Sequence, residues 1–147
     1  MNEIYIDATN LIAGRLSSFV AKNALMGNTI CVVNSENAVI TGTPKLVIEK
    51  YRYRMNETGQ QDSGPNIPRL PDMFLKRLFR GMLPHKQSRG REAMKNIMCY
   101  QGMPSEFKDK KFISLANADV TKKPHIIKYV SIGTICRTLG GKSLDRL

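Results

Sequence analysis

Three consecutive apolar patterns near the start of the chain constrain its fold more than any other feature. Residues 4–6 form a short β-prone run, and residues 13–26 repeat apolar side chains at helical spacing through Leu16, Val20 and Ala24. Gly27 follows in the position that commonly ends a helix. Residues 30–33 are a continuous, largely β-branched run of the kind buried in a parallel sheet.

The same alternation continues to about residue 55. Residues 38–40 form a third β-prone run, and residues 41–44 are expected to open a helix from Lys45 to about Met55. Strands that alternate with helices favour an α/β layer fold. At 147 residues the chain has the length of one ordinary domain. We therefore expect a single domain over 1–147, with a neutral β/α core (1–55), a basic part of loop and helices (56–95) and a C-terminal strand and helix part (96–147).

Charge is distributed unevenly along the chain. Lys and Arg number 23 and Asp and Glu number 12, which gives a formal net charge of +11. Residues 1–50 carry four basic and four acidic residues, residues 51–95 carry ten and four, and residues 96–147 carry nine and four. The positive excess therefore follows residue 50, which indicates a neutral scaffold that presents a positive face to a polyanion.

The pattern changes in kind after residue 55. Residues 56–72 contain three prolines and lack apolar periodicity, so we expect an extended loop. Asp72 is expected to cap a basic amphipathic helix. The apolar face of this helix is assigned to Leu75, Leu78, Phe79 and Met82. Gly81 and Pro84 are expected to close it, with Met82 anchored in the core and Gly81, if its φ is positive, redirecting the chain.

Beyond this helix the sequence predicts a short basic turn over 86–91 and further elements. The apolar residues Ala93, Met94, Ile97 and Met98 suggest another helix. Residues 112–116 and 125–130 are candidate strands. Ser131 is expected to cap a last helix before Gly140 and Gly141. Its apolar face is assigned to Ile132, Ile135, Cys136 and Leu139.

Cysteine usage and hydropathy indicate a soluble protein of a reducing compartment. Cys31, Cys99 and Cys136 are widely separated and lie in apolar contexts, so they are interpreted as reduced core residues without the spacing of a zinc site. No apolar run reaches the roughly 18 residues of a membrane span, and the N-terminus lacks a signal-peptide pattern.

Catalytic motifs have little support. The turn from Thr41 to Lys45 could hold a phosphate, but a nucleoside-triphosphate loop needs a second glycine, and Pro44 removes an amide donor. Contact with an RNA phosphate and a plain helix-start turn stay as the other interpretations. His85 is taken as an exposed or RNA-contacting imidazole and His125 as a strand-start residue. No serine lies in a nucleophile elbow, and the acidic residues are thinly scattered.

The segment from Lys76 to Lys95 is the sharpest chemical feature, with seven basic residues against Glu92 alone. Arginine outnumbers lysine there, and its planar fork suits phosphate oxygens and base stacking. Residues 51–54 interleave tyrosine with arginine, a pattern compatible with stacking on unpaired bases, although Tyr51 is also in phase with Val47 as a core residue. RNA binding is favoured over a merely solvated charged face.

Several segments together resemble a known family, the large-subunit ribosomal protein L13 family, and within it the archaeal and eukaryotic branch. The resemblance is carried by residues 13–16 and 20–22, by residues 39–42, by residues 100–104 and above all by Arg80–Lys86 followed by Arg89 and Gly90. It implies an α/β fold of three layers (α/β/α) with a small parallel sheet and basic loop and helix extensions. It also implies rRNA binding, a structural role in the large subunit, a cytoplasmic location on the ribosome and no catalysis. Residues 53–56 depart from the bacterial branch, which favours an archaeal source, and the likeness thins after about residue 105.

These observations lead to one expected function and two alternatives. The chain is expected to bind large-subunit rRNA, to neighbour other large-subunit proteins, to support subunit assembly, and to need no cofactor, metal or membrane. The alternatives are a nucleotide-binding or RNA-processing enzyme built on residues 42–45 and a basic DNA-binding module. The expected RNA-contacting residues are Lys45, Arg52, Arg54, Arg69, Lys76, Arg77, Arg80, His85, Lys86, Arg89, Arg91 and Lys95.

Overall fold

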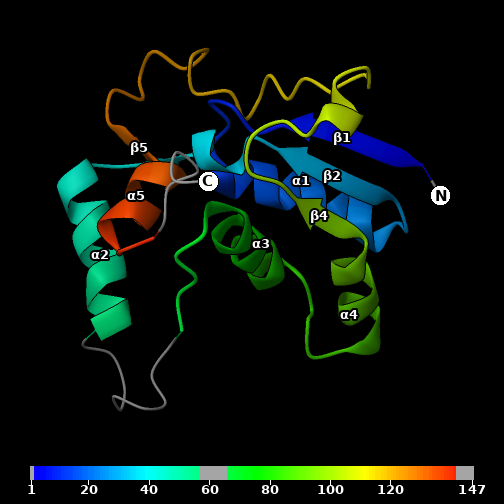
Figure 1. Cartoon of the computed structure of the whole chain (residues 1–147), viewed down its shortest axis with the longest axis horizontal. Coiled ribbons are helices and arrows are strands. Elements are labelled where there is room, and N and C mark those ends of the chain that lie inside the picture. Colours follow the sequence, from blue (N-terminus) through cyan, green and yellow to red (C-terminus); the bar gives the residue numbers. More distant parts are fainter. Residues whose placement is uncertain (1, 57–65, 142–147) are drawn as a thin grey trace.

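The fold is built on a small parallel sheet (Figure 1). A computed structural model describes residues 2–56 and 66–141. Strands β1 (Glu3–Asp7), β2 (Thr29–Val33) and β4 (Ile97–Cys99) lie in the order β1-β2-β4, and both pairings are parallel. The register places Ile4 beside Ile30 and Ile30 beside Ile97, so one face of the sheet is continuously apolar.

A second, two-stranded sheet joins distant parts of the chain. Strand β3 (Val39–Thr41) pairs antiparallel with β5 (Tyr129–Ser131), and helix α5 (Ile132–Thr138) follows β5 directly. Ser131 caps α5 as expected, because its side chain accepts a hydrogen bond of 3.3 Å from the Thr134 amide. This sheet places residues 129–138 beside the first third of the chain.

Four longer helices surround the sheets, together with two short 3-10 helices. Helix α1 (Ala13–Leu25) crosses from β1 to β2, and α2 (Pro44–Asn56) follows β3. Helices α3 (Pro71–Met82) and α4 (Ser88–Lys95) precede β4, while the short helices are η1 (Ser35–Asn37) and η2 (Ser105–Phe107). Figure 1 shows α3 and α4 on one side of the parallel sheet and the segment after β4, in yellow and orange, on the other.

The core lies between the parallel sheet, α1 and α3. Ile6, Leu16, Ile30, Phe79 and Ile97 are completely buried there. Burying an aliphatic or aromatic side chain of this kind contributes about 1.5–3 kcal/mol. The core therefore draws on segments from the whole described chain.

The opposite face of β1 is covered by aromatic side chains of the segment after β4. The ring of Tyr5 lies 5.5 Å from that of Phe107, between centroids, and Phe112 forms an isolated bridge with Tyr5. The Ile113 amide donates to the Tyr5 carbonyl at 2.9 Å. The segment contains the short helix η2 (Ser105–Phe107) and is held to β1 by isolated contacts. The strand expected over 112–116 is not formed, apart from the bridge at Phe112.

The predicted α/β class and small parallel sheet are confirmed. The ranges of β1, α1, β2 and α2 agree closely with the sequence patterns, and Gly27 ends α1 with φ of +88°. The expected strand over 125–130 is present only from Tyr129, and His125 lies exposed in a turn. The expected loop over 56–72 falls partly outside the described residues, since 57–65 are not among them. The division into a single domain stays a prediction.

Four expectations for the basic region were wrong. Asp72 does not cap α3, because the helix begins at Pro71 and Leu70 is the residue before it. Gly81 lies inside the last turn of α3, and it is not among the residues with positive φ. Met82 is 49% exposed and lies at the surface beside Ser18 of α1, although Phe79 in the same turn is completely buried. Ile97 and Met98 belong to β4, not to a helix.

Candidate nucleic-acid interface

The strongest candidate site is the α3–α4 unit, which we define as residues 71–95. Helix α3 buries Phe74, Leu75 and Phe79 against the core, and Leu83 is buried just after it. Arg77 and Arg80 are exposed on the other side of the same helix. The apolar face thus fixes the helix, and the arginines project from a rigid support.

The turn between the two helices is fixed by backbone contacts. The His85 amide donates to the Leu83 carbonyl at 2.8 Å, and the Gln87 amide donates to the Pro84 carbonyl at 2.9 Å. Gly90 is buried against this turn, and a Cβ added there would lie 2.1 Å from the Pro84 carbonyl oxygen. Only glycine permits so close an approach, so Gly90 sets the position of α4 relative to α3.

Helix α4 presents its charges from an uncapped N-terminus. Gln87 precedes the helix without a side-chain capping bond, and Arg89, Arg91 and Lys95 are exposed while Ala93 is buried. The amide groups of a helix N-terminus attract anions, and nearby guanidinium groups add charge-assisted hydrogen bonds. This end of α4 therefore suits a phosphate group of a nucleic acid.

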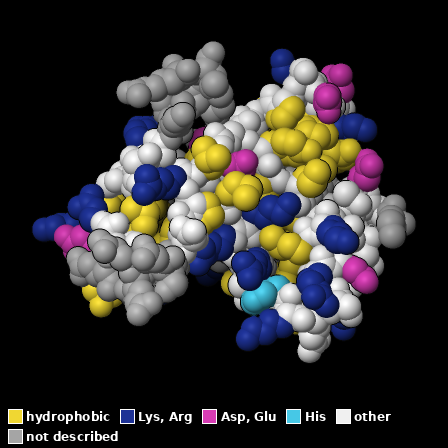
Figure 2. Space-filling view, turned by 60° about the horizontal axis from the view of Figure 1, so that its bottom comes forward, with side chains coloured by type: hydrophobic (Ala, Val, Ile, Leu, Met, Phe, Trp, Pro, Cys, Tyr) yellow, Lys and Arg dark blue, Asp and Glu magenta, His cyan; other side chains and the backbone are white. Residues whose placement is uncertain are grey.

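Eight of the twelve expected RNA-contacting residues belong to the α3–α4 unit, and six of these lie together on it. They are exposed in every case except His85, which is half-buried. Figure 2 shows dark blue Lys and Arg side chains gathered around a histidine on this part of the surface, with few acidic side chains between them. The six are Arg77, Arg80, His85, Lys86, Arg89 and Arg91, and Lys95 ends α4 beside them.

The other expected residues are more dispersed. Arg52 and Arg54 are exposed on α2, whose Tyr51 ring contacts Phe74 of α3 with centroids 5.0 Å apart. Lys45 is exposed near the start of α2. It lies nine positions before Arg54 and so roughly 13 Å from it along the helix axis.

Lys76 and Arg69 lie in surroundings that differ from those of the other expected residues. Lys76 is half-buried and near Cys99, where its positive charge opposes the burial that raises the pKa of this thiol to about 12. Arg69 lies beside Gly140 and Gly141, because a Cβ added at Gly141 would be 2.2 Å from the Arg69 carbonyl oxygen. Arg69 therefore lies against the end of α5 and outside the α3–α4 unit.

The turn from Thr41 to Lys45 has a structural role in the sheet. The Gly42 amide donates to the Lys128 carbonyl at 2.9 Å, with a φ of +132° at Gly42. The Val47 amide donates to the Thr43 carbonyl at 3.0 Å, which begins the hydrogen bonding of α2. Because the Gly42 amide already has a partner, it is not free to hold a phosphate.

The prediction that the cysteines are core residues is confirmed for Cys136 but not for Cys31 and Cys99. Cys136 is buried and Cys31 and Cys99 are half-buried, and all three are free thiols. Burial raises the pKa of Cys99 and of Cys136 to about 12 each. Within residues 2–56 and 66–141, no group of three His, Cys, Asp or Glu side chains is placed to hold a metal ion.

Sequence reasoning missed two features of the basic region. Phe74 is a core residue of α3, and its i, i+4 relation to Leu78 was the available signal. The role of Gly90 depends on the carbonyl of Pro84 and had no local signal. The sequence patterns also gave no prediction for the lysines of the segment after β4. The amino nitrogen of Lys110 in that segment lies 5.4 Å from the centroid of the Tyr5 ring.

The described residues form a small basic protein with an α/β fold and an arginine-rich helical surface, a class of surface that suits a polyanionic partner. The family model described as "Ribosomal protein L13" matches residues 1–106. The large ribosomal subunit protein uL13 of Methanococcoides burtonii is 45% identical over 137 residues, which cover 93% of this chain and 97% of that protein. The uL13 protein of Methanosarcina barkeri is 44% identical over 93% of this chain and 97% of its own length. That of Archaeoglobus fulgidus is 42% identical over 92% of this chain and 86% of its own length.

The chain therefore belongs to the ribosomal protein L13 family. This confirms the predicted family and its archaeal branch. The family consists of structural proteins of the cytoplasmic ribosome, so the alternative of a nucleotide-dependent enzyme is rejected. No helix in the described residues is long and apolar enough to cross a membrane.

Proposed function

We propose that this ribosomal protein binds large-subunit rRNA through the α3–α4 unit and thereby supports assembly of the subunit beside neighbouring ribosomal proteins. One observation carries the proposal: exposed arginines on α3 and α4 are held by a buried apolar face and by the Gly90 contact with Pro84. Residues 66–95 contain eight basic and only two acidic residues. Such a surface matches the phosphate backbone of RNA.

The proposed binding works through preorganised charge. Each cation that neutralises a phosphate releases condensed counterions, which makes binding stronger at low salt. Because α3 and α4 are already fixed, less conformational entropy is lost when their side chains contact the RNA. Arg52 and Arg54 on α2 add charge at the edge of this surface.

The test is a charge deletion with a matched control. The variant Arg77→Ala, Arg80→Ala, Arg89→Ala, Arg91→Ala should bind a large-subunit rRNA fragment more weakly, with a salt slope flatter by about one unit per lost phosphate contact. Circular dichroism should be unchanged, because all four side chains are exposed. The control removes an equal charge from the segment after β4, by Lys108→Ala, Lys111→Ala, Lys122→Ala and Lys128→Ala.

The control variant should keep most of the parental slope. Equal losses in the two variants would mean that binding follows net charge alone, and an unchanged slope in the arginine variant would overturn the proposal. Duplex DNA added as competitor at fixed salt should displace the rRNA fragment poorly. Equal competition would favour a general nucleic-acid binder.

A further inference from the structure

A small cavity lies between α2 and α3, at the edge of the basic surface. Its volume is about 200 Å³, and the side chains of Ile67, Phe74 and Leu78 supply an apolar lining. Tyr51 reaches it from α2, and Gly81 of α3 leaves its rim open. Ligand sites for drug-sized molecules usually have about 300–1,000 Å³. The cavity therefore suits a single ring system and excludes a whole nucleotide.

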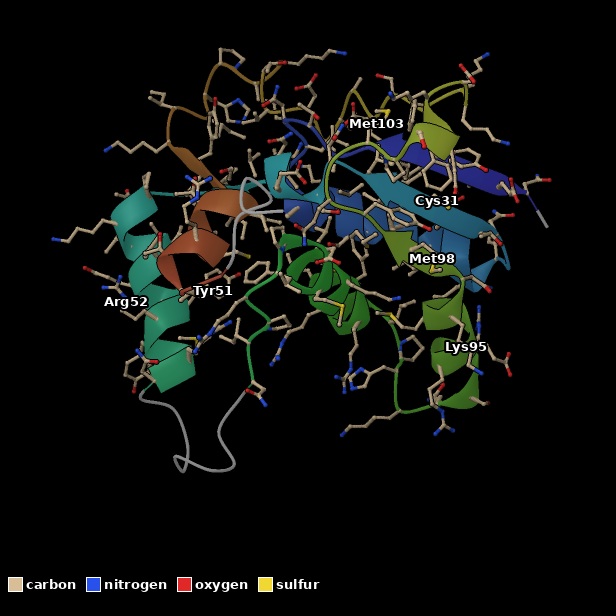
Figure 3. All side chains as sticks on the ribbon, in the orientation of Figure 1. Cys31, Tyr51, Arg52, Lys95, Met98 and Met103 are labelled. Atoms are coloured by element: carbon tan, nitrogen blue, oxygen red, sulfur yellow. The ribbon has the colours of Figure 1, made fainter. Side chains whose placement is uncertain are left out.

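The aromatic wall of the cavity is formed by a packed pair of rings. The Tyr51 ring packs against Phe74 with an interplanar angle of 65° and a centroid separation of 5.0 Å. Figure 3 shows Tyr51 pointing from α2 toward the body of the protein, whereas the neighbouring Arg52 points away from it. A tyrosine hydroxyl is protonated in the neutral pH range and is able to donate a hydrogen bond, and burial raises the pKa of Tyr51 further.

Two arginines complete the lining and give the cavity a positive character. The guanidinium carbon of Arg54 lies 5.9 Å from the centroid of the Tyr51 ring. Arg77 donates from Nη1 to the carbonyl oxygen of Asn66, which ties its side chain across the segment before α3. None of the described lining residues is acidic.

We propose that this cavity receives one unpaired nucleobase of the bound RNA, with the phosphates next to that base on Arg54 and Arg77. The inference rests on the proposed function and adds a base-binding site to it. An unstacked base combines a flat apolar face with polar edges, and proteins hold such bases on aromatic rings and guanidinium planes. An apolar cavity flanked by two arginines offers both surfaces.

The same chemistry disfavours a protein occupant. An apolar side chain of a neighbouring protein would fill the cavity but leave both arginines without an anionic partner. A basic protein surface would also be repelled by the positive charge of these arginines and of the chain as a whole. A nucleotide supplies a ring for the cavity and phosphate groups for the arginines at once.

The test narrows the cavity without removing a charge. A Cβ at Gly81 meets no atom within 4 Å, and Gly81 is helical and lines the cavity, so Gly81→Leu should fold as well as the parent chain and is expected to narrow the cavity. Gly14→Leu on α1 is the matched control, because a Cβ there also meets no atom and the site lies away from the cavity.

Gly81→Leu should lower affinity for the large-subunit rRNA fragment about tenfold. Its salt slope should equal that of the parent within error, because every cation remains. Gly14→Leu should bind as the parent does. Parental affinity in a folded Gly81→Leu chain would overturn the base-binding site while leaving the proposed function intact. Failure of the parent chain itself to bind rRNA would overturn both.

A second measurement uses the unmodified chain. The rRNA fragment, carrying 4-thiouridine, is irradiated in the complex, and the crosslinked peptides are identified by mass spectrometry. A crosslink to Tyr51 or Phe74 is expected. If the RNA crosslinks to other parts of the chain and never to Tyr51 or Phe74, the proposal is overturned.

Discussion

Helices α2 and α3 are nearly equal in length and both carry arginines, yet they are anchored differently. Helix α2 has 13 residues and buries none of them fully, whereas α3 has 12 residues and buries Pro71, Phe74, Leu75 and Phe79. The arginines of α3 therefore project from a helix that is anchored in the core, whereas those of α2 project from a helix at the periphery. Attachment to the core, and not basic composition alone, therefore distinguishes the preorganised arginines of the proposed interface from the auxiliary ones.

The junction between the two helices helps to hold the auxiliary helix, which also packs against α5 and β5. Tyr51 of α2 contacts Phe74 of α3 edge-on, and an aromatic pair of this kind contributes about 0.5–1.5 kcal/mol beyond the burial of its area. The cavity proposed to bind a base is lined by the same two residues. The two helices thus meet where the proposed base would enter.

The largest effect that tests this comparison is expected in the core of α3. Phe79 is completely buried, so Phe79→Ala should lower the free energy of unfolding by about 3–5 kcal/mol. Leu46→Ala on α2 should change it by less than about 0.5 kcal/mol, because Leu46 is 64% exposed. Urea unfolding followed by circular dichroism measures both values. Similar losses in the two variants would show that α2 is anchored as firmly as α3.

A smaller effect is expected where α4 meets the turn after α3. Gly90→Ala places a Cβ against the Pro84 carbonyl and should cost about 1–3 kcal/mol of stability by overpacking. Binding to rRNA should also weaken, although no charge is lost. Gly14→Ala is the control and should be neutral or slightly stabilising, because its Cβ has open space on a helix. Parental binding by a folded Gly90→Ala chain would show that the position of α4 is unimportant.

The smallest effect concerns the thiols that lie near Asp72 of α3. Burial raises the pKa of Cys99 and of Cys136 to about 12, and the negative charge of Asp72 adds to the rise. In the unfolded chain these thiols ionise near pH 9, whereas in the folded chain they stay protonated. Stability should therefore be lost as the pH rises from about 9 toward 12.

The double variant Cys99→Ala, Cys136→Ala isolates this contribution. Its unfolding free energy, measured at pH 8 and again near pH 10.5, should fall less between the two values than that of the parent chain. An equal fall in both chains would mean that α3 does not seal these thiols from water.

Much of the fold was predictable because its patterns are local. The spacing of Leu16, Val20 and Ala24 fixes one face of α1, and the run at 30–33 matches the buried β2. Strand β4 was missed because Ala93, Met94, Ile97 and Met98 fit a helical period as well as the helix-then-strand that the structure contains. Only pairing with β2 decides between the two.

The site was predictable in composition but not in geometry. The sequence identifies the cations of the α3–α4 unit, whereas their support depends on contacts between distant segments. Gly81 and Gly90 show this most clearly, because a Cβ at Gly81 meets open space and one at Gly90 meets the Pro84 carbonyl. Met82 is in phase with Phe79, yet it reaches the surface near Ser18, whose hydroxyl lies 4.0 Å from the Met82 sulfur. No local pattern distinguishes these cases.

A lysine footprint tests the central claim most directly. The chain is treated with an acetylating reagent, free and bound to the large-subunit rRNA fragment, and each lysine is quantified by mass spectrometry. Lys86 and Lys95 belong to the α3–α4 unit, while Lys108 and Lys111 lie in the segment after β4, and all four are exposed. The account predicts that the rRNA protects Lys86 and Lys95 and leaves Lys108 and Lys111 reactive. Protection of Lys108 and Lys111, with Lys86 and Lys95 still reactive, would contradict it.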